Sequence, residues 1–309
     1  MTTTTNTNFE IPFFELPPTL CKVYSDGGHF VAVPYLPTGK QPPKKYEKTY
    51  LQEVFESLYA YALNDGMTRK QTLDFLRGNL CTEFEDETAL NEFITEEMKR
   101  KAHNLGQRKK RFRRKAFLNR WTHFVTITYS DEKHDEETFR KKLRRCLCNL
   151  HTRRGWRYMG VFERAPETKR LHFHALLYVP DGEMISTITE KRDYSTKSHT
   201  MQTTQENAFF AEKFGRNDFA SINADELKHG GTIGYLLKYI GKTGERITYS
   251  RGIPTEIMRE VDGNDIAAEM HDFITKYVLF DDVIDYDTEV AHLHYGQMTI
   301  TDYLSRYRC

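Results

Sequence analysis

Features that define several protein classes are missing from the 309 residues of this chain. No apolar run approaches the roughly eighteen residues of a membrane-spanning helix. Residues 1–6 lack both the basic and the apolar part of a signal peptide. We therefore expect no contact with a membrane and a location in a cytoplasm.

Cysteine is scarce, and its spacing excludes two kinds of cross-link. The odd number of cysteines argues against a disulfide framework. The pair Cys146 and Cys148 lacks the two-residue gap of zinc knuckles. Free thiols are therefore predicted at all five positions, which are Cys21, Cys81, Cys146, Cys148 and Cys309.

Acidic residues are absent from 99–120, where Lys and Arg abound, although the net charge of the whole chain is only +1. A run of basic residues that immediately precedes the candidate catalytic region favours contact with nucleic-acid phosphates. A solvated helix face or an exposed linker is the alternative. The predicted DNA-binding residues are Arg108, Lys109, Lys110, Arg111, Arg113, Arg114 and Lys115.

A nucleotide-binding signature is also missing. Gly241-Lys242-Thr243 resembles the end of a phosphate-binding loop, but that motif requires glycine five positions earlier, where Leu236 stands. The sequence therefore gives no sign of an ATPase or of a helicase domain.

A strand predicted at 170–179 carries the first candidate site. Its two-residue period places His172 and His174 on one face and Leu171, Phe173 and Ala175 on the other. Two imidazoles that project side by side from a strand can bind a metal ion, because the pleat fixes their spacing. The alternative is that both are ordinary residues of a half-exposed polar face.

A second strand predicted at 156–163 offers a third ligand. If the two strands form a hairpin with its tip near residues 167–168, paired residue numbers sum to about 335. Glu163 then lies opposite His172 and shares its face. Two histidines and one carboxylate suit Mn²⁺ or Mg²⁺, and the ligand types leave Zn²⁺ and Fe²⁺ open.

A helix predicted from Gly230-Gly231 to about Gly241 carries the second candidate site. Tyr235 and Tyr239 are one turn apart on the same face, with Lys238 and Lys242 close by. Two aromatic residues at this spacing commonly pack in a core. The flanking lysines make that interpretation less favourable here.

A similar pattern near the end of the chain competes for the same interpretation. His292 and His294 form another His-x-His, followed by Tyr303 and Tyr307. This copy lacks a flanking apolar strand and a carboxylate partner across a hairpin, so we favour the upstream set.

The predicted elements alternate as β-α-β-β-α-β-α, which indicates an α+β fold with an antiparallel sheet and packed helices, of the ferredoxin-like split β-α-β class. Helical periodicity also marks residues 47–104. The predicted organisation is an extended arm at 1–46, a helical region at 47–119 that ends in the basic run, a catalytic core at 120–250 and an acidic C-terminal extension at 251–309. The core contains a strand at 123–129, a helix at 137–150, the two hairpin strands, a polar insertion at 180–204, a short helix at 206–213 and a strand at 219–222.

Three motifs in order resemble the HUH endonucleases, specifically the two-tyrosine replication initiators of small circular single-stranded DNA phages and rolling-circle plasmids. They are the Thr126–Tyr129 strand, the His172-Phe173-His174 strand and the tyrosine helix that ends in Gly241-Lys242. The resemblance covers about residues 120–250 and implies the same HUH core.

The resemblance also implies an activity and its partners. Tyr235 or Tyr239 would attack origin DNA and form a 5′-phosphotyrosine, assisted by a divalent metal held by Glu163, His172 and His174. The implied partners are single-stranded origin DNA and the helicase and polymerase of a host cell. Two alternatives stay open: a metal-dependent hydrolase that uses the same histidines, and a non-catalytic nucleic-acid-binding protein.

Overall fold

The structure is a computed structural model, and it divides into two compact units that are described separately. One unit comprises residues 40–255 with 289–291, and the other joins the first 39 residues to most of the chain after Glu256. No helix in the described residues is long and apolar enough to cross a bilayer. The structure describes residues 18–27, 29–35, 47–165, 170–195, 199–223, 231–240, 246–262, 266, 268–270 and 276–279.

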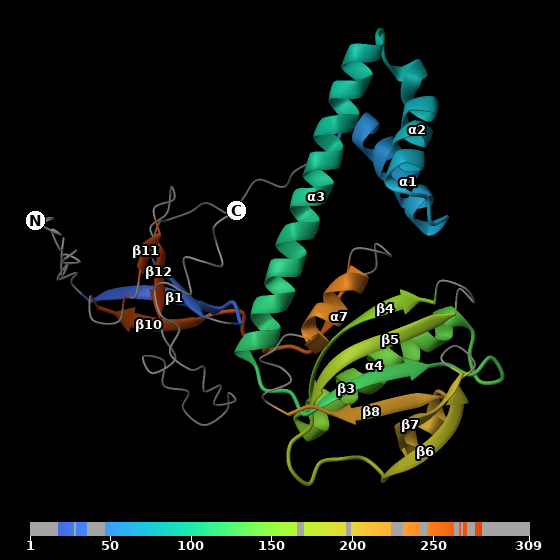
Figure 1. Ribbon diagram of the computed structural model, residues 1–309, viewed down its shortest axis with the longest axis vertical. Helices are drawn as coiled ribbons and strands as arrows, with labels where there is room; N and C mark the ends of the chain where they lie inside the picture. Colours follow the sequence, from blue (N-terminus) through green and yellow to red (C-terminus); the bar gives the residue numbers. More distant parts are fainter. Residues whose placement is uncertain are drawn as a thin grey trace, which may run out of the picture. The chain divides into compact units, whose positions relative to one another are not determined.

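The larger unit is built on a five-stranded antiparallel sheet with the order β8-β3-β5-β4-β9 (Figure 1). The β-α-β-β-α-β order predicted from the sequence is present, and the α+β class with an antiparallel sheet is confirmed. The strands are β3 (His123–Thr128), β4 (Arg157–Arg164), β5 (Leu171–Tyr178), β8 (Asn217–Ser221) and β9 (Thr248–Tyr249).

One face of this sheet is apolar throughout. Alternate residues of β5, including Leu171, Phe173 and Ala175, point into a core that the helices α4 (Glu136–Arg154) and α5 (Ala208–Lys213) cover. Helix α4 begins with the Asp135 side chain as its N-cap and ends at Gly155, whose φ of 67° suits glycine. Burial of this face provides the hydrophobic stabilisation of the sheet.

The opposite face packs against two other helices. Helix α7 (Gly231–Ile240) buries Ile233, Leu236 and Ile240 against a core that includes Met159 and Val161 of β4. The C-terminal part of α3 (Glu87–Leu118) joins the same core through Phe112, Ala116 and Phe117. The tyrosine helix is therefore held between the sheet and α3.

The helices α1 (Tyr50–Asn64), α2 (Arg69–Leu80) and α3 precede the sheet, with a short 3₁₀ turn at Cys81–Glu83. Thr49 and Thr68 form capping boxes at the starts of α1 and α2. Phe55, Leu76 and Ile94 belong to a cluster that joins the three helices. The helical periodicity at 47–104 is thus confirmed, and α3 continues through the basic run.

The segment expected to be a polar insertion contains a two-stranded ribbon instead. Its strands are β6 (Ile188–Ser195) and β7 (Thr200–Asn207), which pair in antiparallel register. Asn207 and Asn217 are buried and hydrogen-bonded to each other's backbones, which anchors the ribbon beside β8. The sequence missed it because neither strand carries the alternation of apolar residues that identifies a half-buried strand.

The smaller unit contains a second sheet where an arm and an acidic extension were expected. Its strand order is β10-β1-β2-β12-β11. The described residues 19–25 and 30–34 are therefore strands that pair with the C-terminal part of the chain, and the expected extended arm is corrected there. The strands are β1 (Thr19–Ser25), β2 (Phe30–Pro34), β10 (Ile257–Val261), β11 (Ala268–Met270) and β12 (Lys276–Leu279).

The cysteines that the structure describes form no disulfide with one another. Cys21 and Cys146 are buried, and Cys81 and Cys148 are exposed. Burial raises the pKa of the Cys21 thiol and of the Cys146 thiol, which keeps both protonated and unreactive. The remaining cysteine, Cys309, lies outside the described residues.

Candidate active site

The hairpin of β4 and β5 has the register predicted from the sequence. Glu163 pairs with His172, and Val161 pairs with His174. Because alternate residues of a strand share a face, Glu163, His172 and His174 all lie on the side of the sheet that packs against α7. These three side chains therefore meet on one surface.

Strand β3 supplies two hydroxyl groups that hold the histidine rings. Thr126 pairs with His174 and Thr128 pairs with His172. The Thr126 Oγ1 lies 3.0 Å from Nδ1 of His174, and the Thr128 Oγ1 lies 2.6 Å from Nδ1 of His172. A hydrogen bond at Nδ1 leaves Nε2 of each ring as the nitrogen available to a ligand.

Sequence reasoning placed Thr126 and Thr128 in a motif but gave them no role. The available signal was their own alternation: two hydroxyls two residues apart on a strand that pairs with a His-x-His strand share its polar face. What the sequence did not supply was the pairing of β3 with β5, which lie more than forty residues apart.

Glu163 and His174 form a buried pair. Their Oε2 and Nε2 atoms are 3.0 Å apart, and both side chains are more than nine-tenths buried. Two donors bound to one ion at about 2.1 Å and a right angle are also about 3 Å apart, so this pair has the spacing of two ligands. Within the described residues, no three such side chains close into a complete metal-binding group.

The environment of His172 favours its neutral form. Burial lowers the pKa of His172 below its usual range; the nearby His174 and Arg170 lower it further, while Glu163 acts in the opposite direction. A neutral imidazole is the form that binds a metal ion. The donor chemistry of the set therefore fits a divalent cation.

Helix α7 brings both tyrosines onto this face. The ring of Tyr239 stacks on His174 with centroids 5.1 Å apart, and the ring of Tyr235 meets His174 edge-on at 5.8 Å. Tyr235 also contacts the ring of Phe124 on β3. The two motifs that are some sixty residues apart in the sequence thus form one cluster.

The two phenols differ in their surroundings. Tyr235 is 39% exposed, whereas Tyr239 is 9% exposed. Burial raises the pKa of Tyr239, and the hydrogen bond with Tyr235 and the charge of Glu163 raise it further. Tyr235 is the phenol that a polymer arriving from solvent can reach.

The remaining predicted residues of this site are only partly described. Lys238 is exposed on α7, on the turn between the two tyrosines. Lys242 lies outside the described residues, as do His292, His294, Tyr303 and Tyr307 of the competing pattern.

The basic run forms part of α3 and is amphipathic. Phe112 is buried against α7, while Lys110, Arg111 and Arg113 are exposed and Arg108, Lys109 and Arg114 are half-buried. Lys115 donates a hydrogen bond to the Ile253 carbonyl and lies over the Tyr249 ring. The structure therefore divides the run between helix packing and a basic surface, with Lys115 on the packing side.

Comparison with known proteins adds one match to this geometry. A family model described as "Replication-associated protein", of the ORF2 type, matches residues 122–244. This part of the chain is similar to replication-associated proteins. The matched segment begins just before β3 and extends past α7, so it includes every residue of the cluster around His174. No curated protein and no solved structure matches the chain.

Proposed function

We propose that this protein is a replication initiator of the two-tyrosine HUH type, which nicks one strand of origin DNA and later rejoins the ends in rolling-circle replication. The observation that carries the proposal is the packing of two tyrosines from one helix against His174, which is itself bonded to Glu163. The similarity of residues 122–244 to replication-associated proteins supports it independently.

In the proposed reaction the phenol oxygen of Tyr235 attacks the scissile phosphorus. A phosphorus–oxygen bond to the 3′ side breaks, the phenolic proton leaves to solvent, and the departing 3′ oxygen takes up a proton. The products are a 5′-phosphotyrosine and a free 3′-hydroxyl that primes synthesis. A covalent intermediate preserves the bond energy that later rejoining requires.

Glu163, His172 and His174 would hold a divalent cation, Mn²⁺ or Mg²⁺, beside the attacking phenol. When bound, such an ion polarises the phosphate and offsets the charge that develops on it. Thr126 and Thr128 orient the imidazoles for this role. Lys238 and Lys242 are proposed to add positive charge near the same phosphate.

The second tyrosine has a separate part in the proposal. Tyr239 lies one turn from Tyr235, with ring centroids 4.8 Å apart. After the first cut, a small movement of the helix or the DNA brings the second phenol to the next junction while the first still holds its strand. Host helicase and polymerase would provide unwinding and synthesis, which no motif of this chain supplies.

Substitution of both Tyr235 and Tyr239 by Phe tests this function against its two alternatives. A two-tyrosine nickase loses all covalent capture of single-stranded DNA. A metal-dependent hydrolase that uses the same histidines keeps cutting without an adduct. A non-catalytic binding protein shows no cutting in the parent and keeps its affinity in the variant.

A further inference from the structure

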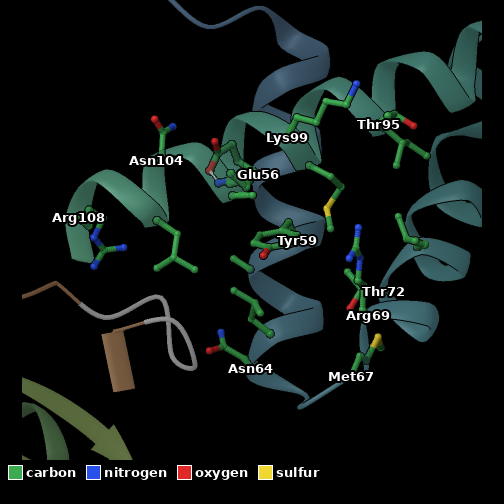
Figure 2. A pocket seen from close by; sticks show the side chains of 18 of the residues that line it. Glu56, Tyr59, Asn64, Met67, Arg69, Thr72, Thr95, Lys99, Asn104 and Arg108 are labelled. Atoms are coloured by element: carbon green, nitrogen blue, oxygen red, sulfur yellow. Dashed lines mark hydrogen bonds and ion pairs between the residues drawn. The ribbon is translucent and has the colours of Figure 1, made fainter. Parts of the chain in front are cut away.

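A basic groove of about 1160 Å³ lies outside the tyrosine and histidine cluster. It is lined by α1, α2 and α3, and Figure 2 shows labelled side chains from all three helices around it. Seven lining residues are basic and one, Glu56, is acidic. The basic residues are Arg69, Arg77, Lys99, Lys101, Arg108, Arg144 and Arg246.

The single acid does not neutralise this surface. Glu56 is already bonded to Lys101 and lies 3.6 Å from Lys48 and 3.4 Å from Arg100. By contrast, no ion pair ties Arg69, Lys99 or Arg246 to a carboxylate within the described parts of the chain. All three side chains are exposed. A concave surface with excess positive charge attracts a polyanion.

The groove continues toward the tyrosine helix. One part of its lining is Ile240, the last residue of α7 and the neighbour of Tyr239, and another part is Arg108 at the start of the basic run. Asn64, Asn91, Asn104 and Thr95 add polar groups among the cations. A strand bound at the tyrosines can therefore continue into the groove without leaving the protein surface.

We propose that this groove is a second binding site for the DNA backbone, which holds the strand that flanks the nick. The inference rests on the proposed function for the identity of the polyanion. It adds α1 and α2, which lie outside the matched residues 122–244, to the DNA-binding surface. Phosphate contacts of this kind fix the position of DNA and carry no sequence information directly.

The test compares two triple charge reversals in the full-length protein. The groove variant is Arg69→Glu, Lys99→Glu and Arg246→Glu. The matched control is Lys141→Glu, Lys142→Glu and Arg153→Glu, three exposed positions on α4 that do not line the groove. Both variants change the net charge equally. Binding of fluorescent mixed-sequence DNA, single-stranded and duplex, is followed by anisotropy over a series of salt concentrations.

The groove variant should bind at least about tenfold more weakly than the control, and its salt slope should fall by about 2 to 3, since each lost phosphate contact removes about 0.7 to 0.9. A loss confined to one form of DNA would show whether the flank is single-stranded or duplex. Equal losses in the two variants, or an unchanged slope, would overturn the proposal. Alanine at the same groove positions replaces the reversals if melting shows a folding defect, with the same two criteria.

Covalent capture by the parent protein is measured separately. If the parent forms no adduct with single-stranded DNA and Mn²⁺, the nicking proposal fails, and the comparison of the two binding variants still decides whether the groove holds DNA.

Discussion

The two faces of the five-stranded sheet come from the same strands but differ in every chemical property. On β5, Phe173 and Ala175 face the apolar core beneath α4, while His172 and His174 face the tyrosines of α7. On β3, Val125 and Ile127 face the core while Thr126 and Thr128 hold the histidines. Strand alternation thus separates stability from chemistry one residue at a time, and a rigid apolar face fixes the geometry of the polar one.

The largest effect is expected within the polar face, from the tyrosines. Tyr235→Phe should slow the first cleavage of an origin oligonucleotide by about a thousandfold or more, because it removes the exposed nucleophile. Tyr239→Phe should retain that cleavage and lose transfer of a held end to a new junction. Gel assays of cutting and of joining measure the two steps. Identical behaviour of the two variants would mean that their different burial has no functional consequence.

The apolar face should answer with stability. Phe173→Ala removes a ring that is 1% exposed, and the expected loss is about 3–5 kcal/mol in the free energy of unfolding. Chemical denaturation followed by circular dichroism checks this value. At a temperature where the variant is still folded, its covalent capture of DNA should approach that of the parent. A stable variant without capture would contradict the division between the faces.

The histidines should show the opposite pattern. His172→Ala is expected to lower metal-dependent cleavage by about a hundredfold or more, because it removes a ligand from the proposed set. His172 is half-buried, so the melting temperature should change far less than for Phe173→Ala. Chelation of divalent metal should abolish cleavage by the parent as well. Full activity in a variant with both His172 and His174 changed to Ala would move the site to His292 and His294.

The smallest effect should come from the hydroxyls that hold the histidines. Thr128→Val keeps the shape of the side chain and removes the hydrogen bond to Nδ1 of His172, so the affinity for Mn²⁺ should fall about 10- to 100-fold. Thr128→Ser should restore it. Titration calorimetry with Mn²⁺ measures the affinity without DNA, and equal affinities in the Val and Ser variants would rule out orientation by this hydroxyl.

Local patterns predicted much of the polar face. The pairing of Glu163 with His172 followed from hairpin arithmetic, and the tyrosine spacing followed from helical periodicity. That the helix lies over the histidines was supplied only by the family resemblance, because contacts between distant segments leave no periodic signal. The unequal burial of Tyr235 and Tyr239 was not predicted for the same reason.

The sheet of the smaller unit shows the limit more sharply. Its strand β1 pairs with β10, more than two hundred residues away, at Cys21↔Arg259 and neighbouring positions. Short apolar patches near Phe30 were visible in the sequence, but no local pattern identifies a partner at that separation. The Pro- and Thr-rich flanks made an extended arm the natural interpretation.

Peptide mapping of a covalent adduct tests the central claim most directly. Labelled single-stranded origin DNA is incubated with the protein and Mn²⁺, the complex is digested with nuclease and protease, and the labelled peptide is sequenced by mass spectrometry. The account predicts a 5′-phosphate joined to Tyr235 in the parent, and no adduct in the variant with both Tyr235 and Tyr239 changed to Phe. A label on Tyr303 or Tyr307, or cleavage without any adduct, would contradict it.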